Sequence, residues 1–161
     1  MFHFAARLWL PRPRIEVFDF FSDASNLEEI TPPWVQFQVV TPTPIRIQQG
    51  TEIDYRLKIR GLPVRWRSRI TVWDPPHRFV DDQVRGPYRK WIHEHRFSEE
   101  SGGTLCEDSV TYAPLGGALI NELFVERDVR KIFAYRSDRL QVLFQGELVK
   151  QNASEGDALC L

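Results

Sequence analysis

Between residues 53 and 72 charged and apolar side chains alternate with a period of two, and this pattern restricts the fold more than any other feature of the chain. Two such runs, residues 53–59 and 64–72, flank Gly61. Successive strand residues point to opposite faces, so the runs predict two half-buried antiparallel strands joined by a tight turn. The charged positions of the two runs are Asp54, Arg56, Lys58, Arg65, Arg67 and Arg69.

Five further segments have the composition of strands, and turn residues separate them. They are residues 2–10, the stretch beginning at Trp34, and residues 78–85, 89–97 and 104–112. Two short helices are predicted after the first strand, one in residues 13–21 and one in residues 22–30. The predicted order is therefore a strand, two short helices and six strands.

From Gly117 to Phe144 the apolar period becomes that of an amphipathic helix. Its expected inward stripe consists of Leu119, Leu123, Ile132, Phe133, Leu140 and Leu143. The inner face of the sheet is the only apolar surface large enough to cover this stripe. The sequence thus predicts an α+β fold, a seven-stranded antiparallel sheet wrapped around a long C-terminal helix. We expect one domain in residues 1–147 and a polar, disordered tail in residues 148–161.

Charge and cysteine content exclude several classes of function. The net charge is −1 and the charges are dispersed, so there is no basic surface for nucleic acid or an anionic membrane. Arg7 and Pro11 interrupt the N-terminal apolar run, which predicts neither a signal peptide nor a membrane-spanning segment, and hence a cytoplasmic protein. Cys106 and Cys160 have no metal-ligand spacing, and no disulfide is expected.

Residues 89–97 read RKWIHEHRF and place two of the four histidines on one face of a strand. The charged row, Lys90, Glu94 and Arg96, belongs in water. The opposite row then faces inward. It consists of Trp91, His93, His95 and Phe97.

The same argument orients the neighbouring strands. The arginine row of residues 64–72 turns Trp66, Ser68 and Ile70 inward, and Phe79 favours an inward row with Asp81 and Gln83. On the last strand the expected inward row is Cys106, Asp108, Val110 and Tyr112. Adjacent strands would then bring Asp108 close to the two histidines from one side and Asp81 or Gln83 from the other.

Three stretches of the sequence resemble a known superfamily. PRPRIEVFDFFSDASNLEEITPPW, residues 11–34, resembles the opening of the START-like superfamily, also called SRPBCC. PPHRFVDDQVRGPYRKWIHEHRF and FVERDVRKIFAYRSDRL are similar to a bacterial, polyketide cyclase/dehydrase-like branch of largely uncharacterised proteins. The resemblance covers residues 2–145. It implies a helix-grip fold around a hydrophobic cavity, on a scaffold that enzymes, carriers and sensors share.

With that fold, the sequence favours a protein that binds a hydrophobic or amphipathic small molecule, such as a lipid, a polyketide-like compound or an aromatic compound, as a monomer or homodimer. A second hypothesis is a cyclase, dehydratase or hydrolase in which His93, His95 and Asp108 are the acid and base. A third is a partner-binding scaffold with a filled cavity. The expected ligand-binding residues are Tyr55, Trp66, Ser68, Phe79, Asp81, Gln83, Trp91, His93, His95, Phe97, Tyr112, Leu123 and Phe133.

No cofactor is expected. His93, His95 and a carboxylate could supply three metal ligands. However, same-face residues of one strand lie about 6–7 Å apart at the Cα atoms, so both imidazoles would have to converge on one ion. We therefore predict no metal site.

Overall fold

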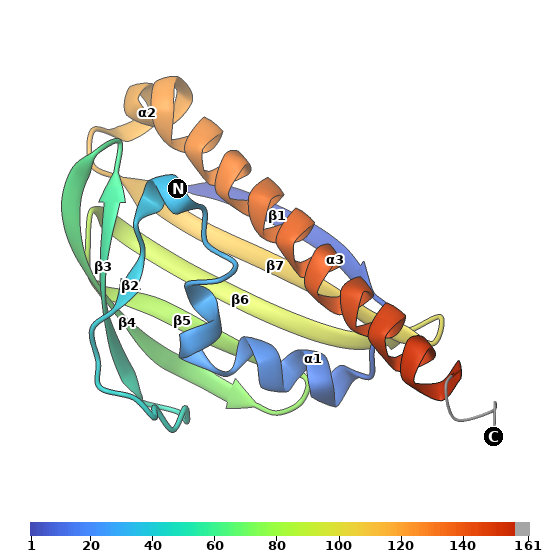
Figure 1. Cartoon of the computed structure of the whole chain (residues 1–161). Coiled ribbons are helices and arrows are strands. Elements are labelled where there is room, and N and C mark those ends of the chain that lie inside the picture. Colours follow the sequence, from blue (N-terminus) through green and yellow to red (C-terminus); the bar gives the residue numbers. More distant parts are fainter. Residues whose placement is uncertain (157–161) are drawn as a thin grey trace.

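The computed structural model describes the backbone of residues 1–156 and the side chains of residues 1–145. Its seven strands form one antiparallel sheet in the order β1-β7-β6-β5-β4-β3-β2 (Figure 1). The predicted seven-stranded antiparallel sheet is confirmed. The strands are β1 (Phe2–Leu10), β2 (Gln38–Val39), β3 (Glu52–Ile59), β4 (Leu62–Asp74), β5 (Arg78–Arg85), β6 (Tyr88–Glu100) and β7 (Gly103–Pro114).

The helices lie together on the inner face of the curved sheet, where α3 runs across it and α1 packs beside β6 and β7 (Figure 1). The segment from Trp34 is mostly not a strand, because Pro32 and Pro33 begin a 3-10 turn and only Gln38–Val39 pairs with β3. The helices are α1 (Arg14–Phe21), η1 (Ala24–Leu27), η2 (Pro33–Val35), α2 (Gly117–Ile120), the π-helical turn η3 (Asn121–Val125) and α3 (Glu126–Gly156).

Helix α3 continues beyond the predicted domain boundary at residue 147. Part of the predicted tail, residues 157–161, lies outside the described residues, as do the side chains from residue 146 onward. No helix in the described part of the chain is long and apolar enough to cross a membrane.

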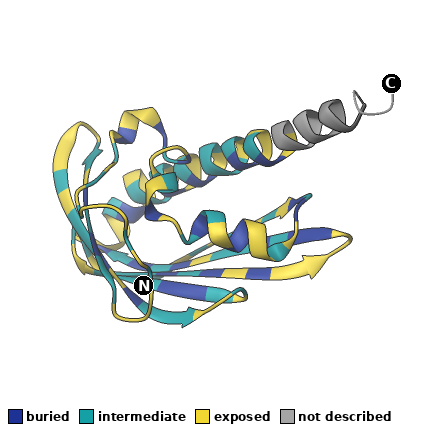
Figure 2. Cartoon of the chain, turned by 60° about the horizontal axis from the view of Figure 1, so that its bottom comes forward, coloured by how far each residue is buried: buried dark blue, intermediate teal, exposed yellow. Residues whose placement is uncertain are grey.

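The two faces of the sheet differ in burial as the alternation predicts. On β6 the side chains of His93, His95 and Phe97 are buried, whereas Lys90 and Arg96 are exposed. Figure 2 shows buried residues on the strands and on the helices. The inward register, on which every candidate site residue depends, is therefore the one that the charged rows indicate.

The core has three clusters, one of Ala24, Ile53 and Tyr55 and two under α3. Under α1, the ring of Phe18 contacts Trp73, Phe79 and Phe97 at centroid distances of 5.2, 6.0 and 5.5 Å. The second cluster under α3 contains Val110, Tyr112, Val129 and Phe133. Between these two clusters the inner face of the sheet is free to line a cavity.

The predicted inward direction is wrong for two residues of the stripe. Leu119 and Leu123 are 67% and 54% exposed. The π-helical turn η3 contains one residue more than an α-helical turn. It therefore rotates the preceding residues relative to α3, away from the directions that a continuous 3.6-residue period predicts. Val129, which the predicted stripe did not include, is buried, and the predicted member Phe133 is buried as expected.

We expect Cys106 to resist alkylation in the folded protein. Burial, and then the nearby Asp108 carboxylate, raise the pKa of the Cys106 thiol to about 12, so at pH 8 only about one thiol in 10,000 is the reactive thiolate. The measurement is mass spectrometry after iodoacetamide treatment of a Cys160→Ser variant, because Cys160 lies outside the described residues. Labelling as fast as in urea-unfolded protein would contradict this prediction.

Candidate functional site

A cavity of about 790 Å³ lies between the sheet and α3. Aliphatic and aromatic side chains make most of its wall. Ser68, Asp81, His93 and His95 form a polar group on β4, β5 and β6, and charged side chains of the β3–β4 turn and of α3 also line the cavity. Nine of the predicted ligand-binding residues line this cavity. They are Tyr55, Trp66, Ser68, Phe79, Asp81, Trp91, His93, His95 and Phe133.

Four predicted ligand-binding residues lie elsewhere. The Gln83 side chain holds the β5–β6 turn, where its Nε2 donates to the backbone oxygen of Tyr88 at 2.7 Å. Phe97 belongs to the core under α1 and Tyr112 to the second core cluster. Leu123 is exposed, so its expected inward direction was wrong.

The strand register brings two histidines and two aspartates together. Asp81 of β5 pairs with His93, and Asp108 of β7 pairs with His95. His93 Nε2 lies 2.8 Å from Asp108 Oδ1 in a hydrogen bond. His95 Nδ1 lies at the same distance from that oxygen but without hydrogen-bond geometry, and this contact is an ion pair when the His95 ring is protonated. We call these four residues the His–Asp cluster.

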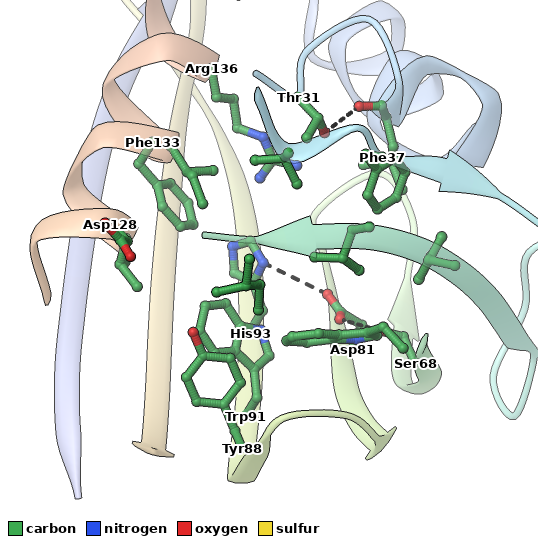
Figure 3. Close-up of a pocket in the computed structure, with 18 of the residues that line it drawn as sticks. Thr31, Phe37, Ser68, Asp81, Tyr88, Trp91, His93, Asp128, Phe133 and Arg136 are labelled. Carbon is green, nitrogen blue, oxygen red and sulfur yellow. Dashed lines mark hydrogen bonds and ion pairs between the residues drawn. The ribbon is translucent and has the colours of Figure 1, made fainter. Parts of the chain in front are cut away.

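The second nitrogen of each imidazole points toward Asp81. His93 Nδ1 and His95 Nε2 lie 3.8 and 3.6 Å from Asp81 Oδ2. Figure 3 shows His93 and Asp81 directed toward each other. Both rings therefore lie between the two carboxylates. Asp81, His93 and His95 line the cavity, and Asp108 lies behind them.

Hydrogen bonds link Asp81 through Ser68 to Trp66. Ser68 Oγ donates to Asp81 Oδ1 at 3.0 Å, and Trp66 Nε1 donates to Ser68 Oγ at 3.0 Å. Because Asp81 is held through one oxygen, its other oxygen keeps a fixed direction toward the imidazoles.

The surroundings shift the pKa values of the cluster in different directions. Burial lowers the pKa of His93, and the adjacent His95 acts in the same sense. Burial also disfavours the charged form of His95, but contacts with Asp108 and Asp81 outweigh it and raise the pKa of His95. Burial opposes charge on Asp108 as well, yet the contacts with His93 and His95 hold the pKa of Asp108 well below its ordinary value.

Sequence reasoning missed Arg136, which α3 points into the cavity (Figure 3). Its side chain is 13% exposed, lies 4.0 Å from Asp108 Oδ1, and places its guanidinium 5.6 Å from the centroid of the Phe133 ring. A signal was present, because Arg136 is three residues after Phe133 and four before Leu140, on the inward stripe of α3.

Tyr88 is the other missed residue. It lies at the start of β6, and its ring centroid is 4.8 Å from that of Trp91 and 5.7 Å from that of Trp66. The three rings form an aromatic wall at one end of the cavity, as Figure 3 shows for Tyr88 and Trp91. Tyr88 was missed because it directly follows the turn residues Gly86 and Pro87 and the predicted strand began at residue 89.

At the cavity wall the β3–β4 turn is joined to α3. Arg60 donates from Nε and from one terminal nitrogen to Asp128 at 2.8 and 3.1 Å, and its guanidinium lies 4.5 Å from the centroid of the Phe124 ring. All three residues line the cavity. The Arg60–Asp128 pair therefore closes one side of it.

We expect Arg60→Ala to speed ligand exchange while leaving the fold intact. A partly exposed ion pair contributes up to about 1 kcal/mol, which corresponds to about a fivefold faster dissociation if the pair must open for release. Stopped-flow dissociation of a fluorescent naphthalene probe measures the rate. Arg65→Ala, on the outer face of β4, is the control and should leave the rate unchanged; equal rates for the two variants would contradict the prediction.

A curved antiparallel sheet that holds a long helix across its inner face, with a cavity between them, defines the helix-grip class of proteins. A sequence profile described as polyketide cyclase/dehydrase and lipid transport matches residues 10–135. The chain belongs to this family, in agreement with the resemblance seen in the sequence. No curated protein matches the chain.

Solved structures of other proteins share the fold. Ms6760 from Mycobacterium smegmatis is 19% identical with a TM-score of 0.69, over 90% of this chain and 92% of that chain. CV1439 from Chromobacterium violaceum is 13% identical with a TM-score of 0.70, over 88% and 96%. The ginseng major latex-like protein 151 from Panax ginseng is 12% identical with a TM-score of 0.66, over 89% and 97%. At these identities the likeness establishes the fold alone.

Proposed function

We propose that this protein binds an amphipathic small molecule in the cavity, with the apolar body of the ligand against the aromatic wall and an uncharged polar group on the His–Asp cluster. The observation that carries the proposal is the pair of buried histidines with Asp81 on the mostly apolar wall of a cavity of about 790 Å³. Ligand sites typically combine an apolar wall with a few convergent polar groups. A scaffold with a filled interior, the third hypothesis from the sequence, does not fit that volume.

The wall favours a ligand with ring systems. Trp66 and Trp91 meet nearly perpendicularly, at an interplanar angle of 87°, and Tyr88 contacts both. Such rings present faces and edges against which a flat aromatic scaffold packs favourably, beyond the gain from burial.

The charges favour a polar group without net charge. Both carboxylates of the cluster contact the imidazole pair, and Asp108 also lies 4.0 Å from the Arg136 guanidinium, so the negative groups already have partners. A hydroxyl or carbonyl can donate to or accept from these groups without a new charge being buried. A carboxylate would add a negative charge beside Asp81 and Asp108 and bear the desolvation penalty.

Fluorescence titration with one polycyclic aromatic scaffold tests the proposal. The scaffold is used unsubstituted and in its hydroxyl, carbonyl and carboxylate forms, and binding is followed through the tryptophans of the wall. We expect the hydroxyl and carbonyl forms to bind most tightly. In His95→Phe, which keeps the bulk but removes the polar group, the hydroxyl form should lose roughly tenfold in affinity and the hydrocarbon should not.

Glu94→Ala is the matched control, since Glu94 lies between the two histidines and points outward. It should leave all four affinities unchanged. Preference for the carboxylate form, or equal loss of every form in His95→Phe, would contradict the proposed polar contact.

Acid–base catalysis of a cyclisation or dehydration is a second candidate for the same cavity. The observation that favours it is the pair of imidazoles, with ring centroids 3.8 Å apart, in contact with two carboxylates at the wall. Such a pair could move a proton to and from one ligand oxygen. If the cavity is catalytic, the protein should convert a hydroxylated or keto polycycle, and His93→Gln should abolish the conversion but not the binding. Binding of the polycycle without conversion would mean that the protein is a carrier.

A further inference from the structure

We propose that Asp81, His93 and His95 bind one divalent transition-metal ion, such as Zn²⁺, at the wall of the cavity. The inference goes beyond the proposed function, because it concerns the protein's own side chains and is tested with no organic ligand present.

The possible metal-ligand atoms of Asp81, His93 and His95 lie close to one another. One donor atom from each of the three residues lies within 4.8 Å of the other two. The distances of 3.8 and 3.6 Å from Asp81 Oδ2 to His93 Nδ1 and His95 Nε2 exceed the roughly 2.7–3.2 Å of a direct hydrogen bond. Ligands about 2.0–2.2 Å from a tetrahedral ion are about 3.4 Å apart. The two carboxylate–imidazole distances therefore exceed those of a metal-bound set by only a few tenths of an ångström.

Asp108 occupies the position of an outer carboxylate behind the ligands. A metal-bound histidine usually donates its other ring N–H to a carboxylate, which fixes the tautomer and the orientation of the ring. His93 Nε2 makes this bond to Asp108 Oδ1 at 2.8 Å. An ionised carboxylate has no proton to give, so in a neutral ring the proton lies on Nε2 and Nδ1 offers its lone pair toward Asp81.

The two imidazoles converge as a shared metal ion would require. Same-face residues are separated at the Cα atoms, but here the two rings lean together until their centroids are 3.8 Å apart. The ring of Phe79 stacks on His95 at 4.3 Å, and Phe133 meets His93 edge-on at 5.4 Å. Because these rings hold the imidazoles together, the site is organised before an ion arrives.

The donor set and its place define the kind of ion. Two imidazoles and one carboxylate suit zinc, cobalt or nickel, whereas calcium and magnesium prefer oxygen ligands. All three ligand residues line the cavity, so a coordination position remains open toward it. An ion there could coordinate the oxygen of a bound molecule.

Calorimetric titration of the untagged full-length protein with Zn²⁺ tests this site. A Cys160→Ser background removes the thiol that lies outside the described residues. We expect one ion per chain. Asp108→Asn should weaken binding roughly 10–100-fold, as outer-shell changes do, and Asp81→Asn and His95→Gln should weaken it more. His77→Gln, at an exposed histidine, should have no effect.

A second measurement keeps the test valid if a variant folds poorly. Co²⁺ added to the parent protein should give the intense visible absorption of a four- or five-coordinate ion, and one equivalent of Zn²⁺ should remove it. The proposal is overturned if the parent protein binds no Zn²⁺. It is equally overturned if folded Asp81→Asn, judged by circular dichroism, binds Zn²⁺ as tightly as the parent, because surface groups then hold the ion.

Discussion

Ile132→Trp should abolish most ligand binding without unfolding the protein. Ile132 lines the cavity from α3 and is only half-buried, so a larger side chain can extend into space that a ligand would use. If the indole displaces about 100 Å² of ligand contact, the loss at about 25 cal/mol per Å² is about 2.5 kcal/mol, or roughly 70-fold in affinity. Fluorescence titration with the hydroxyl-bearing polycycle measures the loss.

Ala134→Trp is the matched control, with the same side chain two residues away on the exposed side of α3. It should bind the polycycle as the parent does. Both variants should unfold cooperatively in urea. If Ile132→Trp folds and retains full affinity, the ligand is not bound between α3 and the sheet.

Asp108→Ala should cause the largest loss of stability among single changes in the site. The carboxylate contacts both imidazoles and lies 4.0 Å from the Arg136 guanidinium, and its side chain is only 13% exposed. Removing one partner of a buried charge network leaves the others uncompensated and costs about 3–5 kcal/mol. For a domain of this size the melting temperature should fall by about 6–20 °C, which calorimetry measures.

Glu107→Ala separates this effect from a general sensitivity of β7. Glu107 is the neighbouring residue but points to the outer face, where it pairs with Arg7 at 3.0 Å and remains 39% exposed. An exposed ion pair contributes under about 1 kcal/mol, so this variant should melt close to the parent. Equal losses in the two variants would show that the His–Asp cluster is not a special source of stability.

The charged outer rows explain why so much of the sheet could be predicted. Arg65 and Arg69 cannot be buried without partners, so their strand has only one allowed register, and in the structure Arg69 pairs with Glu52 on the outer face. The adjacency of His95 and Asp108 followed from that register and from the meander order. Local pattern was sufficient there because strand faces alternate strictly.

The helix side of the cavity was predicted less well, because the direction of each side chain depends on the rotation of the helix about its axis as well as on the apolar period. The π-helical turn at Asn121–Val125 moves Leu123 outward, and no apolar period reports such a turn in advance. Arg136 was overlooked because a charged residue on an amphipathic helix is normally solvated. Its burial makes sense only once β7 has placed Asp108 opposite it.

The most direct test of ligand binding in the cavity is native mass spectrometry of the purified parent protein and of Ile132→Trp, each before and after incubation with the hydroxyl-bearing polycycle. We expect the parent to carry one bound molecule per chain, either co-purified or taken up, which organic solvent releases, and Ile132→Trp to carry far less at the same polycycle concentration. A parent protein that has the mass of the bare chain both before and after incubation would contradict this expectation.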